Sequence, residues 1–254
     1  MKTAAGIEAA AFERDGYLVV RGLCPPALRE VLKDAVKSQL DPLLGPVEYE
    51  ADVGYPGAPA NRHVVGGDTP RRLLSACSRD PVLRQWATGP QVGSVLRELF
   101  GQAEIFVSQS HHNCVMTKHP GYSSATLWHQ DIRYWSFDRP ELISVWLALG
   151  RETVRNGALK VIPGSHRAQI DRGRLDSVLF LRPELEENRK LIEQARTVEL
   201  EAGDTLFFHC RLFHAAGMNL TDDVKLSAVF TYHTDDNQPI PATRSAQLPS
   251  IPLG

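Results

Sequence analysis

The chain has 254 residues, of which 43% are hydrophobic and 23% charged, and its formal net charge is −2. A balance this close to neutral provides no global field for nucleic acid or an anionic membrane, so neither is expected as a partner. The four cysteines show no Cys-x-x-Cys spacing, which is typical of a reducing compartment. Without the apolar stretch of a signal peptide or a membrane span, we expect a cytoplasmic protein that acts on or binds a small molecule.

The N-terminal part of the chain is predicted to be rich in helices. Residues 6–15 indicate a short helix, which is followed by Tyr17-Leu18-Val19-Val20, an apolar run typical of a strand. Pro25 and Pro26 mark the start of a second helix, whose apolar residues recur at helical spacing. Further helices are expected at 71–77, 81–87 and 92–100.

Residues 41–68 show little periodicity and contain scattered proline, glycine and tyrosine. A loop of this length within a compact domain is usually either disordered or functional, for instance as a lid over a site. The sequence leaves both interpretations open.

After Gly101, runs typical of β-strands follow one another, separated by turn signals such as Asn156-Gly157 and Gly203-Asp204. The expected strands are 103–115, 126–132, 142–149, 158–162, 196–200, 205–209 and 225–233. A charged segment, 183–196, predicts a helix inserted between strands. No internal repeat or linker divides the chain. We therefore expect one domain, 1–254, with a helix-rich layer (1–101), a β-sandwich or open barrel (102–235) and an extended C-terminal tail (236–254).

A candidate metal site lies in Leu127-Trp128-His129-Gln130-Asp131. Side chains two apart on a strand face the same way, so His129 and Asp131 can chelate one ion. A third ligand is offered downstream by His209 or His214. Small neighbours favour His214, but chemistry alone leaves both open. A set of two histidines and one carboxylate, with open positions opposite, is what a non-haem Fe(II) oxygenase requires.

An ordered set of motifs resembles the phytanoyl-CoA dioxygenase family of Fe(II)- and 2-oxoglutarate-dependent oxygenases. The resemblance extends from about residue 10 to residue 235. Its motifs are Phe12-Glu13-Arg14-Asp15-Gly16-Tyr17, Trp128-His129-Gln130-Asp131, Val145-Trp146-Leu147-Ala148-Leu149, Asn156-Gly157-Ala158-Leu159-Lys160-Val161-Ile162-Pro163-Gly164-Ser165-His166, Gly203-Asp204, and Phe207-Phe208-His209 with His214.

The resemblance implies a mainly β protein with flanking helices, built on a double-stranded β-helix of the jelly-roll, cupin-like type. It implies His129, Asp131 and His214 as the catalytic metal ligands, with Fe(II), 2-oxoglutarate and O2 as cofactors. His209 and His166 then become structural residues rather than ligands.

The resemblance also implies contacts to the co-substrate from Lys118, Gln130 and Trp146, although Trp146 packs equally well as plain core. Eleven residues after the last ligand, where the family usually has an arginine, this chain has Lys225. A lysine offers a point charge in place of the planar arginine fork, and Ser227 on the same strand face can add a hydroxyl donor. Anchoring by Arg211, or a 2-oxo acid other than 2-oxoglutarate, remains an alternative.

The expected reaction is hydroxylation of a small organic molecule, with decarboxylation of 2-oxoglutarate to succinate and CO2. Asp131 argues against halogenation, because related halogenating enzymes replace this carboxylate to make room for chloride. Two alternatives remain: a non-catalytic β-sandwich that binds a metabolite or a partner protein, and a metal enzyme that performs hydrolysis or isomerisation without 2-oxoglutarate.

Substrate contacts are expected from the loops 45–65, 118–127, 133–139 and 168–180. Their aromatic and arginine side chains suggest a substrate with an anionic group. These side chains are Tyr49, Tyr55, Arg62, Arg71, Arg72, Tyr122, Arg133, Tyr134, Trp135 and Phe137.

Overall fold

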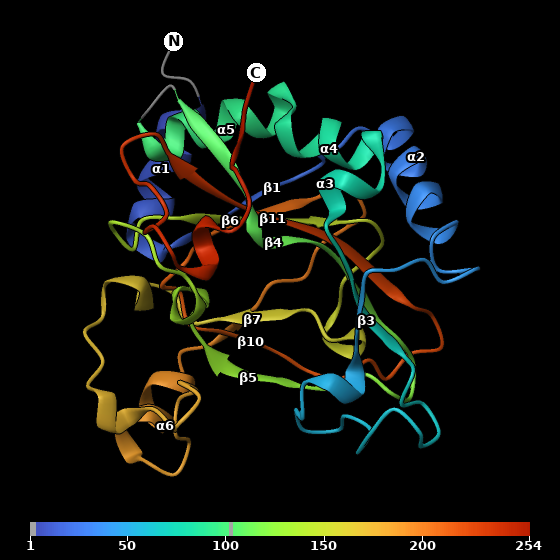
Figure 1. Cartoon of the computed structure of the whole chain (residues 1–254). Coiled ribbons are helices and arrows are strands. Elements are labelled where there is room, and N and C mark those ends of the chain that lie inside the picture. Colours follow the sequence, from blue (N-terminus) through green and yellow to red (C-terminus); the bar gives the residue numbers. More distant parts are fainter. Residues whose placement is uncertain (1–3, 102–103) are drawn as a thin grey trace.

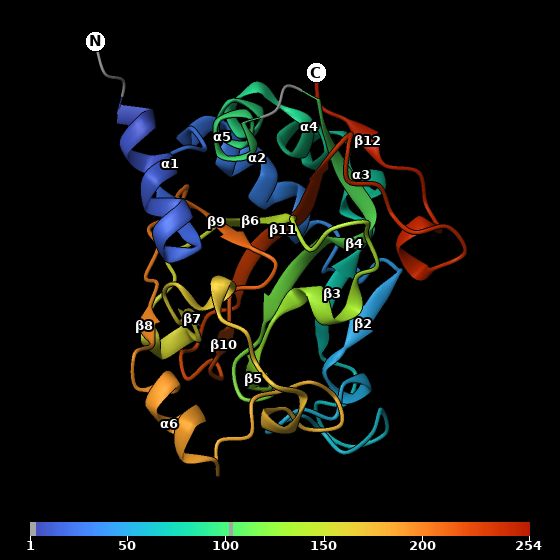
Figure 2. The ribbon, with the colours of Figure 1, turned by 90° about the vertical axis from the view of Figure 1, so that its left-hand side faces the viewer.

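The computed structural model describes residues 4–101 and 104–254; the predicted start of a strand at Ala103 lies outside them. Two antiparallel β-sheets form the centre of the molecule, and most of the helices gather on the outer side of the larger sheet (Figure 1). In the turned view, the smaller sheet lies on the face of the larger sheet opposite these helices, with α6 beyond it (Figure 2). The helices are α1 (Ala4–Asp15), α2 (Pro26–Lys37), α3 (Ala76–Arg79), α4 (Pro81–Thr88), α5 (Pro90–Phe100) and α6 (Glu186–Ile192).

The larger sheet has the strand order β1-β9-β6-β11-β4-β3-β2, and β12 pairs with β4. Its strands are β1 (Tyr17–Val20), β2 (Val47–Tyr49), β3 (Pro70–Leu74), β4 (Ile105–Lys118), β6 (Ile143–Ala148), β9 (Thr205–His209), β11 (Lys225–Thr234) and β12 (Ile251–Pro252). The smaller sheet has the order β5-β10-β7-β8. Its strands are β5 (Thr126–His129), β7 (Leu159–Val161), β8 (Arg196–Thr197) and β10 (His214–Ala216).

Short 3-10 helices occupy several of the connections between strands. They are η1 (Glu50–Asp52), η2 (Asp131–Tyr134), η3 (Val154–Asn156), η4 (Ser165–Arg167), η5 (Arg172–Arg174) and η6 (Arg244–Ala246).

Alternation along β11 separates two hydrophobic cores. Leu226, Ala228, Phe230 and Tyr232 belong to the core between the larger sheet and the helices. Val229 belongs to the core between the two sheets. Successive side chains of a strand point to opposite faces, so the odd-numbered residues of β11 face the smaller sheet. Any site between the sheets is therefore lined by these residues.

The pairing of β4 with β11 is interrupted by a bulge. Phe230 pairs with Asn113 but the next residue, Thr231, pairs with Ser108. Four residues of β4, 109–112, therefore have no partner on β11. A bulge of this kind leaves the extra residues outside the ladder and redirects their side chains.

The C-terminal tail covers this bulge. Gln109 donates a hydrogen bond to the Pro249 carbonyl at 2.6 Å, and His111 Nε2 lies 2.7 Å from the Ser245 hydroxyl. The tail is mostly extended, apart from η6 and the short strand β12.

Most of the predicted elements are present in the structure. The helices near 6–15, 81–87 and 92–100 and the strand at 205–209 are confirmed, the last with the same bounds. The helix predicted at 71–77 is wrong: residues 70–74 form β3, which pairs with β4, and α3 begins only at Ala76. The segment 41–68 contains β2 and η1, and β1, β2 and β3 all join the larger sheet, so the first 101 residues are more than a helical layer.

Across residues 4–101 and 104–254, we find no helix long and apolar enough to cross a membrane.

Candidate metal centre and adjoining cavities

His129, Asp131 and His214 meet where β5 and β10 pair. His214 opens β10 and lies opposite His129, the last residue of β5. Asp131 opens η2, so a turn rather than strand alternation brings its carboxylate beside the two rings. The Nε2 atoms of His129 and His214 lie 3.7 and 3.5 Å from Asp131 Oδ1. Donor atoms from all three residues lie within 4.8 Å of one another, so they can share one metal ion. These three residues are called the metal group below.

Hydrogen bonds on the far side of each ring orient the two histidines. His129 Nδ1 lies 2.8 Å from the Leu127 carbonyl oxygen, and His214 Nδ1 lies 3.0 Å from that of Leu212. A carbonyl oxygen only accepts, so we assign the ring proton to Nδ1 in both residues. The lone pair on each Nε2 is then directed to the shared centre, as in metal sites with supporting contacts to the backbone.

Buried surroundings keep these side chains in the protonation states that a metal requires. Burial lowers the pKa of His129 to about 3, and the neighbouring His214 ring adds to this effect. Burial alone would raise the pKa of Asp131, but the rings of His112 and His214 outweigh it and hold that pKa well below its usual range. The Ser144 hydroxyl also donates to Asp131 Oδ2 at 3.1 Å. At neutral pH the group presents an uncharged His129 ring and an ionised carboxylate, as metal ligation demands.

His112 also lies beside these three residues, although no motif in the sequence singles it out. It belongs to the β4 bulge, and its Nδ1 lies 3.5 Å from Asp131 Oδ2. That buried nitrogen makes no hydrogen bond within the part of the chain that the structure describes. His112 could not be predicted from the sequence, because its position depends on the bulge between β4 and β11, which the residue pattern of β4 does not reveal.

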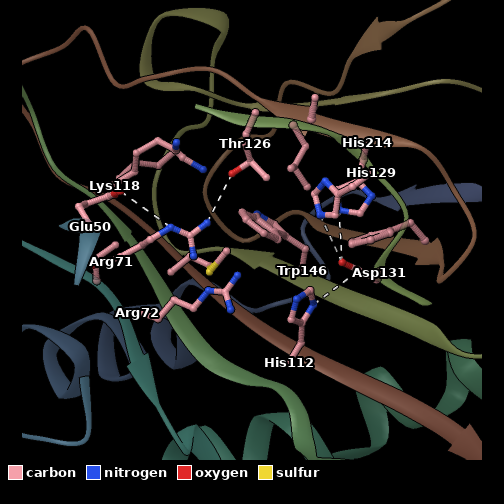
Figure 3. Close-up of a pocket in the computed structure, with 17 residues that line it drawn as sticks. Glu50, Arg71, Arg72, His112, Lys118, Thr126, His129, Asp131, Trp146 and His214 are labelled. Atoms are coloured by element: carbon pink, nitrogen blue, oxygen red, sulfur yellow. Dashed lines mark hydrogen bonds and ion pairs between the residues drawn. The ribbon is translucent and has the colours of Figure 1, made fainter. Parts of the chain in front are cut away.

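A small cavity of about 60 Å³, here called the inner cavity, adjoins the metal group (Figure 3). Its wall is rich in cationic side chains, which suits an anionic ligand. The charged residues of the wall, apart from the metal group, are Arg71, Arg72, Lys118, Lys225 and Glu50.

Lys118 is half-buried in the wall of the inner cavity and has no ion-pair partner among the described residues. It ends β4 directly opposite Lys225 of β11, and its Nζ donates to the carbonyl oxygens of Ser124 and Gly217 at 2.7 Å each. Burial and, to a smaller extent, the charge of Lys225 together lower the pKa of Lys118 to about 7, and Glu50 opposes both effects. An anion bound in the inner cavity would favour the charged form.

Arg71 and Arg72 are compensated by carboxylates. Arg71 Nη1 lies 2.6 Å from Glu48 Oε1, and its Nε lies 3.9 Å from Glu50 Oε2. Arg72 Nε lies 3.3 Å from the same Glu48 oxygen. Both arginines come from β3, the segment that sequence reasoning assigned to a helix.

Three of the residues predicted to bind the co-substrate converge on the carboxylate of Glu152. Its Oε1 accepts from the Ser227 hydroxyl at 2.6 Å and from Trp146 Nε1 at 2.9 Å, and its Oε2 accepts from Lys225 Nζ at 2.9 Å. Glu152 is only 1% exposed. Nothing in the sequence pointed to it, because a glutamate in the turn after a strand usually faces solvent. Lys225 and Trp146 do line the inner cavity, whereas Ser227 does not.

Gln130, His209 and His166 lie away from the metal group. The Gln130 amide donates to the Arg211 carbonyl, and Gln130 lines neither the inner cavity nor the larger cavity described next. His209 Nε2 lies 3.3 Å from Glu141, outside the three-residue group that could hold a metal. The preference for His214 over His209 thus agrees with the geometry.

A larger cavity of about 770 Å³, here called the outer cavity, has a volume typical of small-molecule sites. It shares Arg71, Arg72, His112, Thr126, His129 and Asp131 with the inner cavity, so the metal group lies where the two cavities meet. The rest of its wall includes four large aromatic side chains, Tyr55, Tyr134, Trp135 and Phe180, together with the cation Arg244 and the carboxylates of Glu48 and Asp176.

Half of the predicted substrate contacts lie on this wall. Tyr55, Arg71, Arg72, Tyr134 and Trp135 line the outer cavity. The remaining five, Tyr49, Arg62, Tyr122, Arg133 and Phe137, do not.

Comparison with known proteins agrees with this arrangement. The family model of phytanoyl-CoA dioxygenase (PhyH) matches residues 12–227. The ectoine dioxygenase of Sphingopyxis alaskensis is 26% identical over 248 residues, covering 91% of this chain and 76% of the relative. The structure of EctD from the same organism with 2-oxoglutarate and 5-hydroxyectoine has a TM-score of 0.75 at 23% identity, covering 94% of this chain and 80% of that one.

A second solved structure, the epimerase SnoN with Fe3+, alpha ketoglutarate and nogalamycin RO, also has a TM-score of 0.75 at 23% identity, and covers 95% of this chain and 88% of its own. These likenesses confirm the predicted fold class, a mainly β, cupin-like core with flanking helices. The family match also confirms the predicted cofactor class, iron with 2-oxoglutarate and O2, for which the chain provides a His-Asp-His group. The chain belongs to the phytanoyl-CoA dioxygenase family.

Proposed function

We propose that this protein is an Fe(II)- and 2-oxoglutarate-dependent dioxygenase that hydroxylates a small organic molecule and converts 2-oxoglutarate to succinate and CO2. The observation that carries the proposal is the placement of the metal group between two cavities of different character. The inner cavity is small and cationic, as a 2-oxo acid requires, and the outer cavity is large and aromatic, as an organic substrate requires.

Bound iron, together with 2-oxoglutarate and O2, supplies the oxidation of a C–H bond. The protein holds and orients the reactants. His129, Asp131 and His214 would hold the metal, and Lys118 would bind the distal carboxylate of the 2-oxo acid. Phe180 packs edge-on against His129, with ring centroids 5.8 Å apart, and helps to exclude water from the substrate side.

Hydroxylation is proposed rather than halogenation because Asp131 supplies the third protein ligand. SnoN, whose structure is similar, is an epimerase, so this fold also supports a different outcome in another protein. The outcome for this chain depends on which C–H bond the outer cavity presents to the metal group.

The proposed substrate carries an anionic group. Arg244 lines the outer cavity and has no ion-pair partner within the described ranges. Its guanidinium can meet a carboxylate or phosphate among the aromatic side chains. An Arg244→Met variant should lose turnover of an anionic substrate, whereas turnover of a neutral analogue should stay unchanged.

The test of the proposed function begins without O2. Fe(II) and 2-oxoglutarate added anaerobically should give a weak metal-to-ligand charge-transfer absorption, which His214→Ala should abolish. Admission of O2 should then produce succinate. Absence of both signals would refute the proposal and favour the non-catalytic binding protein. Product that forms under strict anaerobiosis would favour a metal hydrolase or isomerase.

A further inference from the structure

Glu152 is an internal carboxylate placed against the inner cavity. All of its side-chain hydrogen bonds come from buried donors: Lys225, Ser227 and Trp146, at 2.6 to 2.9 Å. Lys225 Nζ also lies 5.0 Å from the centre of the Trp146 ring, so its ammonium is held between this ring and Glu152. Three donors satisfy the hydrogen-bonding capacity of the buried carboxylate and stabilise it in this position.

This arrangement changes the charge that the inner cavity offers to a ligand. Glu48 and Glu50 compensate Arg71 and Arg72, as described above, and Glu152 compensates Lys225. For the described residues, only Lys118 among the cations of the wall lacks a carboxylate partner. A distal carboxylate that approached Lys225 would meet the carboxylate of Glu152 at the same ammonium, and two like charges in one buried site disfavour each other.

We propose that Glu152 is a selectivity residue of the inner cavity: by engaging Lys225 and Ser227, it lowers the preference for 2-oxo acids that carry a second carboxylate. Lys118 alone then recognises the distal carboxylate of 2-oxoglutarate, and 2-oxo acids that lack this group also bind. This inference rests on the proposed function, because it assumes that the inner cavity takes a 2-oxo acid.

The test compares two ligands that differ only in the distal carboxylate: 2-oxoglutarate and 2-oxopentanoate. Their dissociation constants are measured by calorimetry on the anaerobic Fe(II) protein, so the readout does not require turnover. For the wild type we expect the two constants to differ by roughly tenfold, which is the lower end of what one charge-assisted hydrogen bond provides. Glu152→Gln should tighten 2-oxoglutarate about tenfold, because Lys225 becomes available, and should change 2-oxopentanoate less than about twofold.

Two further variants make the result specific. Glu201→Gln removes an exposed carboxylate that pairs with Arg151 at 3.1 Å, and it should leave both constants unchanged. The double variant Glu152→Gln/Lys225→Met replaces a neutral ion pair by two neutral side chains. It should bind 2-oxoglutarate within about twofold of the wild type, and it decides the question even where Glu152→Gln alone fails to fold.

Two results would overturn the selectivity role while leaving the proposed function intact: Glu152→Gln that binds 2-oxoglutarate no better than the wild type, or a double variant that binds it more than about tenfold more weakly. The second result would show that Lys225 anchors 2-oxoglutarate in the wild type. Failure of both acids to bind any variant, with no charge-transfer absorption, would overturn the proposed function together with the inference.

Discussion

Replacing Lys225 by methionine should destabilise the fold strongly. The substitution keeps the length and apolar stem of the side chain but removes the ammonium, leaving the Glu152 carboxylate with two neutral donors, Ser227 and Trp146. Glu152 is 1% and Lys225 5% exposed, so the carboxylate would remain shielded from bulk solvent after the loss of its partner. Removing one member of a buried ion pair costs about 3–5 kcal/mol of unfolding free energy. For a chain of this size that corresponds to a fall in Tm of roughly 6–20 °C.

The assay is equilibrium unfolding in urea, with Lys160→Met as the matched control. Lys160 is exposed on β7, between the buried Leu159 and Val161, so its loss should change stability by no more than about 0.5 kcal/mol. Adding Glu152→Gln to Lys225→Met should recover at least half of the lost stability, because no buried charge then lacks a partner. A Lys225→Met variant as stable as Lys160→Met would refute the reasoning, since it would show that the pair is hydrated.

Other predictions concern the metal group and Lys118. His214→Ala should abolish Fe(II) binding measured by anaerobic titration, whereas His209→Ala should retain it; the reverse order would exclude His214 as a ligand. Because the pKa of Lys118 is lowered to about 7, its ammonium is present below that pH and is lost above it, so affinity for 2-oxoglutarate should fall as the pH rises, by up to about tenfold per unit. Lys118→Arg should flatten this profile in calorimetry, and an unchanged slope would assign it to another group. Gly157→Ala places a Cβ 2.5 Å from the Gly217 carbonyl that holds Lys118, at a backbone φ of +77°, and should weaken 2-oxoglutarate without affecting Fe(II) affinity; equal loss of both would contradict this placement.

The sequence predicted the strands well where alternation and turn residues agree. The run at 205–209 has the predicted bounds because Gly203 opens it and apolar residues fill both faces. Residues 70–74 were misassigned because two arginines and two leucines in sequence show no alternation. They form a strand because β4 and β2 offer backbone partners on both sides, and tertiary pairing outweighs local preference.

The candidate site shows the same contrast between residues that a sequence motif predicts and residues that only tertiary pairing brings into place. His129, Asp131 and His214 could be predicted because a set of ligand types in fixed order leaves a trace in the sequence, even though the turn at Asp131 was not foreseen. Glu152 and His112 could not be predicted. Each acquires its position from pairing between distant strands, which places Glu152 beside β11 and directs His112 out of the β4 ladder.

The bulge in β4 also gives this sheet a place where its length can vary. Residues 109–112 stand outside the ladder, so adding or removing residues there would leave the registers on either side intact, from Lys118 opposite Lys225 to Ile105 opposite Thr234. The same four residues carry His111 and His112 into the wall of the outer cavity. A fold with such a segment can acquire a new substrate by changes in one stretch of strand, while the strand pairings that position His129, His214 and Lys118 stay intact.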